Sequence, residues 1–82
     1  MAVKILIKRK FKDGNMRVAS RLLINNRNEA MKQSGYISSE SWRSLDDTNQ
    51  VVVVSMWDNM EDWKTWKNSE TRLVNEAEFK DY

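Results

Sequence analysis

Hydrophobic and polar residues alternate along parts of the chain, and that alternation predicts β-strands. Residues 2–11 and 36–45 show it, although serines dilute the second stretch. Residues 51–57 begin with consecutive valines instead, a pattern typical of a strand that is covered on both faces. The turn signal at residues 46–50 indicates an antiparallel hairpin between the last two strands. The apolar face of the first strand holds Val3, Ile5, Ile7 and Phe11.

Apolar residues recur at helical spacing over residues 16–33, which predicts a helix whose apolar stripe is interrupted in its middle. Asn15 stands where a helix N-cap is expected. Gly35 stands just past the stripe, where a C-cap glycine is expected.

Two further helical segments are predicted towards the C-terminus. Asp58 or Asn59 caps the first of them, because each is followed three residues later by an acidic residue, as in a capping box. Ser69 caps the second, which covers residues 70–82. This last segment carries a modest apolar stripe of Leu73, Val74 and Ala77.

The predicted order is β-α-β-β-α followed by a short helical tail. A ferredoxin-like α+β domain has the order β-α-β-β-α-β, with its helices on one face of an antiparallel sheet. The chain fits this fold class except that the usual final strand is missing. The helices then leave one face of the valine run 51–54 uncovered, and a second copy of the chain is the simplest cover. The pattern therefore predicts a homodimer.

Composition excludes several kinds of chemistry. Residues 1–82 are short enough for a single domain and contain no cysteine or histidine, which excludes disulfides, thiolate catalysis, cysteine-based metal sites and histidine acid–base catalysis. No apolar run approaches the ~20 residues of a membrane span, and no signal-peptide pattern opens the chain. We therefore expect a cytoplasmic protein with no membrane contact.

The net charge of +2, from 14 basic and 12 acidic residues, is close to balanced. A nucleic-acid-binding surface would need a basic patch together with exposed aromatic residues. A solvated strand end is the commoner meaning of a lysine-rich run, so no nucleic-acid partner is expected. The basic residues that gather near the N-terminus are Lys4, Lys8, Arg9, Lys10 and Lys12.

Residues 35–70, with residues 22–31 before them, resemble the antibiotic biosynthesis monooxygenase-like (ABM) family. The shared pattern is a glycine and an aromatic residue, a strand with Ser and Glu, an Asp-rich turn, an apolar strand ending in Trp, and a helix with Trp followed by Asn-Ser. Here these elements are Gly35, Tyr36, Ser38, Glu40, Asp46, Asp47, the valine run, Trp57, Trp66, Asn68 and Ser69. The resemblance implies a ferredoxin-like fold that pairs into a dimeric α+β barrel. It also implies an activity like that of cofactor-independent oxygenases of quinol-like or anthrone-like aromatics, or of haem-degrading monooxygenases.

The haem-degrading branch fits this chain poorly. Those relatives have an Asn on the first strand, a Trp on the second helix and a His ten residues after that Trp. Trp66 matches the tryptophan, but the Asn position falls on or near Ile7 and the His position falls on Glu76. Without the axial histidine, haem degradation of the usual type is not expected, and no cofactor is expected.

The tryptophans are the first candidate site residues. Trp66 and Trp63 are three residues apart, so both could form a wall on which a flat aromatic substrate stacks. The alternative is core packing, because aromatic pairs at this spacing usually anchor a helix. Core packing is the stronger interpretation for Trp63 than for Trp66, because Trp66 matches the tryptophan of the family pattern. Trp57 ends a buried strand and is interpreted as structural, whereas Trp42 could face either a dimer partner or a cavity.

Polar residues supply the other candidates. Asn26 and Arg27 interrupt the apolar stripe of the first helix, where the amide could bind a substrate oxygen and the guanidinium a phenolate. The commoner outcome for such residues is a solvent-facing turn of helix with a hydrogen bond between helices.

A run of small residues indicates a void in the second predicted strand. Ser39, Ser41 and Arg43 share one face of it with Ile37 and Leu45. Serines on a face that meets helices would leave the space that a ligand pocket requires, but the same face could meet solvent or a partner instead.

The family resemblance, together with this aromatic cluster, implies a cofactor-independent monooxygenase of small aromatic substrates. Such an enzyme needs a dry aromatic pocket, a donor that stabilises the substrate anion, and space for dioxygen. The alternative is a non-catalytic homodimeric protein that binds a small ligand or acts as a scaffold, favoured by the lack of a convincing general base. The expected catalytic residues are Trp66, Asn26 and Arg27, and the expected substrate-binding residues are Trp63, Ser39, Ser41 and Arg43.

Overall fold

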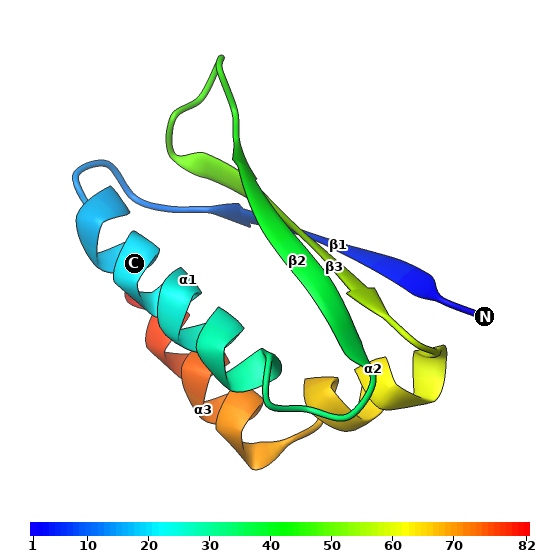
Figure 1. Ribbon diagram of the computed structural model, residues 1–82. Helices are drawn as coiled ribbons and strands as arrows, with labels where there is room; N and C mark the ends of the chain where they lie inside the picture. The colour runs from blue at the N-terminus through cyan, green and yellow to red at the C-terminus, as the bar shows by residue number, and fades with distance from the viewer.

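The computed structural model describes all of residues 1–82, and the elements follow the predicted order. The protein is an α+β domain of three antiparallel strands and three helices (Figure 1). The strands are β1 (Val3–Lys10), β2 (Tyr36–Arg43) and β3 (Gln50–Trp57), and the helices are α1 (Met16–Ala30), α2 (Met60–Lys67) and α3 (Glu70–Phe79). None of the helices has the length and apolar composition needed to cross a membrane.

The valine-rich strand lies at the centre of the sheet, whose order is β1-β3-β2. The helices lie on one side of this sheet, with α1 and α3 side by side and α2 following the end of β3 (Figure 1). No strand follows α3 within these residues, so the sheet has three strands where a ferredoxin-like sheet has four. The missing final strand predicted from the sequence is therefore confirmed.

No helix or loop of this chain packs on the face of the sheet away from the helices, although Val54 on that face is buried among neighbouring side chains. Val52 and Val54 of β3 point to that face, next to Leu6 of β1 and Trp42 of β2 in the strand register. Leu6 is 59 % exposed and Trp42 is 53 % exposed. The chain therefore supplies only one of the two covers that the valine run predicts.

A β-bulge changes which side chains of β2 point towards the helices. The bulge lies at Ile37, so Tyr36 and Ser39 point to the same side although they are three residues apart. Ile37 is exposed, and Leu45 is exposed beyond the end of the strand. The prediction that Ile37 and Leu45 share the face of Ser39 is wrong, because the extra residue reverses the alternation at Ile37 and the strand ends at Arg43, before Leu45.

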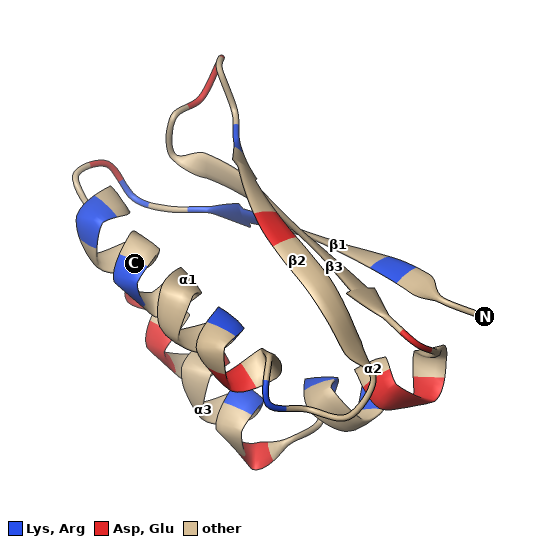
Figure 2. Ribbon diagram, viewed as in Figure 1, with Lys and Arg blue, Asp and Glu red and all other residues tan.

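Side-chain caps begin the two C-terminal helices, as predicted. The Asn59 side chain accepts a hydrogen bond of 2.9 Å from the Asp62 N–H, and Ser69 Oγ accepts one of 3.2 Å from the Arg72 N–H. The first turn of α2 is acidic and its last turn basic, the arrangement that the helix dipole favours (Figure 2). Asn15 occupies the N-cap position of α1, but its side chain makes no capping hydrogen bond.

Gly35 does not cap α1, contrary to the prediction. The helix ends at Ala30, and the chain makes further turns before β2. Gly35 has a φ of 83° at the entry to β2, in the left-handed region that favours glycine. Its carbonyl accepts a hydrogen bond of 2.7 Å from the Asp58 N–H, which joins the start of β2 to the end of β3.

Two small apolar clusters lie between the sheet and the helices. One gathers around the phenylalanines at the end where β3 begins, with the Phe11 and Phe79 rings 5.9 Å apart. The other gathers around the tryptophans at the end where β3 stops. The buried members are Phe11, Ala19, Val51 and Phe79 in the first cluster and Ala30, Trp57, Trp63 and Trp66 in the second.

The inner face of α3 is polar between these clusters. Arg72 and Asn75 are buried there, whereas Leu73 and Val74 are 56 % and 54 % exposed. The apolar stripe predicted for this segment therefore points to solvent and does not hold the helix. The helix is anchored instead by Phe79 and by polar contacts to β1 and α1.

Candidate functional site

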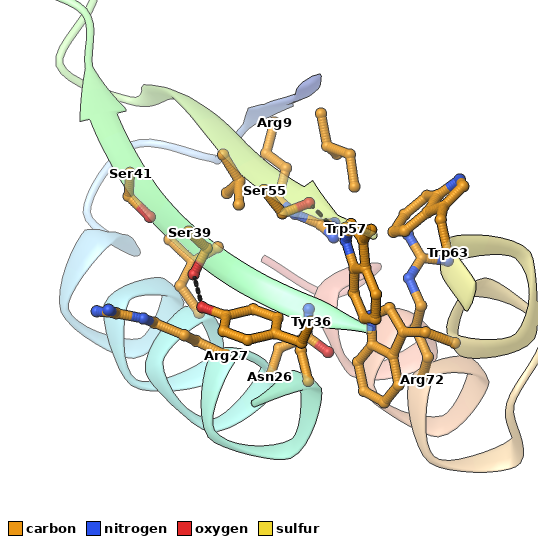
Figure 3. A pocket seen from close by; sticks show the side chains of 15 residues that line it. Arg9, Asn26, Arg27, Tyr36, Ser39, Ser41, Ser55, Trp57, Trp63 and Arg72 are labelled. Atoms are coloured by element: carbon orange, nitrogen blue, oxygen red, sulfur yellow. Dashed lines mark hydrogen bonds between the residues drawn. The ribbon is translucent and has the colours of Figure 1, made fainter. Parts of the chain in front are cut away.

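A cavity of about 50 Å³ lies between the sheet and the helices, beside the tryptophan cluster (Figure 3). A pocket for a drug-sized ligand has roughly 300–1,000 Å³, so this one admits a few waters or one small planar group. Its wall contains aromatic, hydroxyl, amide and guanidinium groups and no carboxylate. The lining residues are Ile7, Arg9, Leu23, Asn26, Arg27, Ala30, Tyr36, Ser39, Ser41, Val53, Ser55, Trp57, Trp63, Trp66 and Arg72.

A wider surface groove of about 470 Å³ adjoins the cavity between α1 and β2. The two spaces have four lining residues in common, which makes them neighbours: Leu23, Arg27, Ser39 and Ser41. A ligand larger than one ring would therefore extend from the cavity into the groove.

The aromatic wall consists of three tryptophans and a tyrosine. Trp57 is completely buried, with its ring centroid 5.6 Å from that of Tyr36 in an edge-on arrangement and 6.0 Å from that of Trp63. Trp63 and Trp66 are buried as well and come from the same face of α2. The rings are both core and cavity wall, so packing and the stacking wall are not exclusive interpretations of these residues.

Hydroxyl groups of the two neighbouring strands form the opposite part of the wall. Tyr36 Oη and Ser39 Oγ share a hydrogen bond of 2.6 Å (Figure 3). Ser55 Oγ accepts a hydrogen bond of 3.1 Å from Trp57 Nε1, which satisfies the buried indole N–H. Ser41 lies further along β2 towards the groove. The void predicted from the serines is present, because small side chains here leave the space unfilled.

The two polar residues predicted on α1 both line the cavity. Asn26 Oδ1 accepts a hydrogen bond of 3.0 Å from Asn75 Nδ2, the contact between helices that sequence reasoning treated as the commoner outcome. The Asn26 NH₂ group has no partner within the protein and remains available as a donor. Arg27 is exposed at the mouth, and its side chain extends away from the tryptophans (Figure 3).

An ion cluster lies at the end of the cavity away from the groove, referred to below as its inner end, and two of its members, Arg9 and Glu76, also line a surface hollow between β1 and α3. Arg9 donates through both terminal nitrogens to the Glu76 carboxylate, one of the bonds being 3.0 Å, and Arg72 Nη2 lies 3.4 Å from the same carboxylate. Burial would raise the pKa of Glu76, but the hydrogen bonds and charge of Arg9, with the charge of Arg72, outweigh it, so that pKa lies below its usual range. Burial also lowers the pKa of Arg72, although a guanidinium stays protonated in a protein.

The arginines Arg9 and Arg72 are site residues that sequence reasoning missed. Arg9 continues the inward alternation of β1, so its position could have been read from the strand pattern. Arg72 could not, because the apolar residues of α3 point outwards. Arg43, expected at the site, lies outside it: its side chain is exposed, and Nε donates a hydrogen bond of 2.8 Å to the Thr48 carbonyl.

No group of three or more acidic side chains is placed to hold a metal ion. The chemistry that the wall offers is stacking on indoles, hydrogen-bond donation from amide and hydroxyl groups, and positive charge. Each of these stabilises a flat ligand with electron-rich oxygen atoms.

The sequence profile of the family named antibiotic biosynthesis monooxygenase matches residues 3–81, almost the whole chain. The chain belongs to this family. The resemblance noted from the local sequence pattern is thereby confirmed. No curated protein shows a significant match to this sequence.

Solved structures show the same fold at low sequence identity. A conserved protein from Methanosarcina mazei Go1 is 14% identical with a TM-score of 0.89, over 98% of this chain and 79% of that one. A Nitrosomonas europaea protein named for the same family is 16% identical with a TM-score of 0.86, over 99% and 77% of the two chains. SnoaB from Streptomyces nogalater, a cofactor-independent oxygenase, is 14% identical with a TM-score of 0.85, over 98% and 81%. The α+β fold of this ABM-family chain is therefore the fold of those proteins.

Proposed function

We propose that this ABM-family protein is a cofactor-independent monooxygenase that oxidises a small quinol-like or anthrone-like aromatic, which occupies the cavity and extends into the adjoining groove. The observation that carries the proposal is the wall itself, which combines buried indoles with an unpaired amide donor at Asn26. Membership of the family and the shared fold with SnoaB, a cofactor-independent oxygenase, support it.

The proposed reaction requires only the substrate and dioxygen. An anthrone-like CH₂ loses a C–H proton to water at the groove, which gives a carbanion that the adjoining rings and carbonyl stabilise. The carbanion transfers an electron to O₂, and one oxygen atom bonds to the carbon to form a peroxide, which takes up a proton. Loss of water from this hydroperoxide leaves a carbonyl group. The CH₂ group and O₂ become C=O and H₂O, so atoms and electrons balance.

The residues have separate roles in this scheme. Trp66 and Trp63 hold the flat substrate and exclude water, which strengthens every polar contact in the cavity. The Asn26 NH₂ group donates to the oxygen that becomes negative when the proton leaves. Arg27 at the mouth attracts the ionised substrate and covers the part that extends into the groove. Ser39 and Ser41 border the same part of the ligand.

We also propose that the functional form is a homodimer through the uncovered face of the sheet. Leu6 and Trp42 place exposed apolar surface there, and the valines of β3 lie between them. A second copy laid on this face would supply the cover that the valine run lacks and complete the dimeric α+β barrel that the family resemblance implies.

Oxygen uptake tests the enzymatic proposal. Purified protein is mixed with a panel of reduced naphthoquinols and anthrones, and consumption of O₂ is compared with autoxidation in buffer. We expect uptake above autoxidation for at least one substrate and a reduction of about 10²-fold in Asn26→Ala, the magnitude for losing one oxyanion donor. Asn75→Ala is the matched control, because it breaks the same hydrogen bond between helices without touching the cavity.

The same experiment separates the enzyme from a non-catalytic ligand-binding protein of this fold. The lack of any carboxylate in the cavity wall favours that alternative, because no group there is an obvious base. Rates equal to autoxidation across the whole panel would reject the monooxygenase and leave the binding protein. Equal losses of rate in Asn26→Ala and Asn75→Ala would reject the role of Asn26.

A further inference from the structure

The charged groups of the cavity wall are all positive. Arg9, Arg27 and Arg72 line it, and no aspartate or glutamate does. Arg27 is at the mouth, where solvent screens its charge, whereas Arg9 and Arg72 belong to the inner end and do not line the adjoining groove. Two of the three positive charges therefore belong to largely buried side chains, since those of Arg9 and Arg72 are each 11% exposed, although Arg9 also borders an open surface hollow between β1 and α3.

A single carboxylate pairs with the two inner guanidinium groups. Glu76 accepts hydrogen bonds from both terminal nitrogens of Arg9 and lies within ion-pair distance of Arg72. Two positive charges face one negative charge, so the cluster carries a net charge of +1. The second terminal nitrogen of Arg72 reaches only the Lys67 carbonyl, at 3.4 Å. Both guanidinium groups lie over aromatic rings, with Arg9 Cζ 4.2 Å from the Phe79 centroid and Arg72 Cζ 5.3 Å from that of Trp63.

The Nε–H of Arg9 is buried and has no hydrogen-bond partner in the protein. It is the one fully buried side-chain nitrogen or oxygen left without a partner. A buried unpaired donor on a charged group is costly, and proteins rarely keep one without a function. An oxyanion in the cavity would satisfy this donor and neutralise the excess charge of the cluster.

The geometry points to a carboxylate as the group that binds at the inner end. We infer that the ligand is an aromatic carboxylate, with its charged end beside Arg9 and Arg72 and its ring system extending past the tryptophans towards the groove. The aromatic character of this ligand rests on the proposed function, whereas its charge rests on the arginines alone. A planar two-oxygen anion matches guanidinium donors, and its small size suits a cavity of about 50 Å³.

Isothermal titration with ligands that do not react with oxygen tests this inference. The probes are 2-naphthoate and naphthalene-2-carboxamide, which have nearly the same shape and differ in charge. We expect the carboxylate to bind at least tenfold more tightly than the amide at pH 7. Equal affinities, or binding of the amide alone, would overturn the inference.

Three variants locate the charge recognition. Arg9→Lys keeps the positive charge but removes the Nε–H, and we expect it to reduce the preference for the carboxylate at least fivefold. Arg43→Gln, the matched control, removes an exposed charge outside the cavity and should leave the preference unchanged. If Arg27→Gln loses the preference for the carboxylate while Arg9→Lys keeps it, the carboxylate is bound at the mouth of the cavity, and the proposed inner site is wrong. The wild-type comparison of the two probes stands even if Arg9→Lys does not fold.

A phenolate could use the same donors, so 2-naphthol is the third probe. This ligand is neutral at pH 7 and ionises near the usual phenol pKa of about 10. If the affinity for 2-naphthol rises towards pH 10 and exceeds the affinity for 2-naphthoate, the inner site binds a phenolate and the inference of a carboxylate is wrong. Because none of the probes reacts with oxygen, their binding is independent of the oxygen-uptake result. Failure of the monooxygenase proposal would leave the carboxylate preference intact, and failure of the preference would not affect oxygen uptake.

Discussion

Arg9, at the end of β1, donates hydrogen bonds from both of its terminal nitrogens to the carboxylate of Glu76 in α3. The two residues are 67 positions apart, and their pair lies between the phenylalanine cluster and the cavity. The contact fixes α3 against β1, on a helix face that offers little apolar surface. It also orients the Arg9 guanidinium, whose Nε is left over for a ligand. One side chain therefore takes part in both a packing contact and the proposed binding site.

This pair predicts a pH-dependent contribution to stability. The pKa of Glu76 is lowered in the folded protein, chiefly because Arg9 and Arg72 outweigh the effect of burial. The contribution is therefore complete above the unfolded carboxyl pKa of about 4.3 and is lost as the pH falls further, through the folded pKa. Glu76→Gln should lower the free energy of unfolding by about 1–3 kcal/mol at pH 7, measured by urea denaturation.

The difference between wild type and Glu76→Gln should shrink as the pH is lowered from 5 to 3. Glu78→Gln is the control, because Glu78 is exposed on the same helix and makes no ion pair. A difference that is as large at pH 3 as at pH 7 would show that the ion pair is not its cause.

The two glycines predict a graded pair of substitutions. Both have φ near +80°, so alanine at either position costs about 1–2 kcal/mol of stability in the left-handed region. A Cβ at Gly14 would meet nothing, whereas one at Gly35 would collide with the Asp62 side chain. Gly35→Ala should therefore lower the unfolding midpoint in urea more than Gly14→Ala does. Equal losses would mean that Asp62 moves aside freely.

Much of the fold could be predicted because short-range patterns determine it. The alternation of β1, the valines of β3 and the caps Asn59 and Ser69 all act over a few residues. The bulge at Ile37 could not be predicted, since it depends on how β2 pairs with β3. One inserted residue was enough to assign Ile37 to the wrong face.

The candidate site was predictable only in part for the same reason. Trp66, Asn26 and Ser39 were found because they break or mark a local pattern, and all three line the cavity. The inner arginines were missed because their role depends on contacts distant in sequence. Arg72 in particular faces inwards while the apolar residues beside it, Leu73 and Val74, face solvent, so the helical pattern indicated the wrong face.

Ser55 predicts a test of the hydrogen bond behind the tryptophan wall. Ser55 Oγ is the only acceptor for the Nε1–H of the fully buried Trp57. Ser55→Ala leaves that donor unpaired and should lower the free energy of unfolding by about 1–3 kcal/mol. Ser20→Ala, at an exposed position of α1 away from the sheet, should change it by less than about 0.5 kcal/mol. If Ser55→Ala lowers the free energy of unfolding as much in a Trp57→Phe background as in the wild type, the hydrogen bond to Trp57 is not the cause of the loss.

The proposed homodimer predicts different outcomes for exposed apolar residues on different faces. Leu6 and Trp42 on the open face of the sheet are 59 % and 53 % exposed, and Leu73 and Val74 on the outside of α3 are 56 % and 54 % exposed. The four side chains are thus almost equally exposed in the single chain and differ in the face of the molecule on which they lie. A charge at the centre of an interface weakens association by about 3 kcal/mol or more, roughly a hundredfold in Kd.

We therefore expect Leu6→Glu and Trp42→Glu to shift the protein from dimer to monomer in sedimentation velocity, because each replaces apolar contact surface between the two sheets with a charge that must lose its hydration. Leu73→Glu and Val74→Glu should sediment as the wild type does. Circular dichroism checks that all four variants are folded. A monomeric wild type would reject the dimer. Dissociation caused only by the α3 variants would place the interface on that helix instead of the sheet, and the outer face of β3 would then stay uncovered in the dimer.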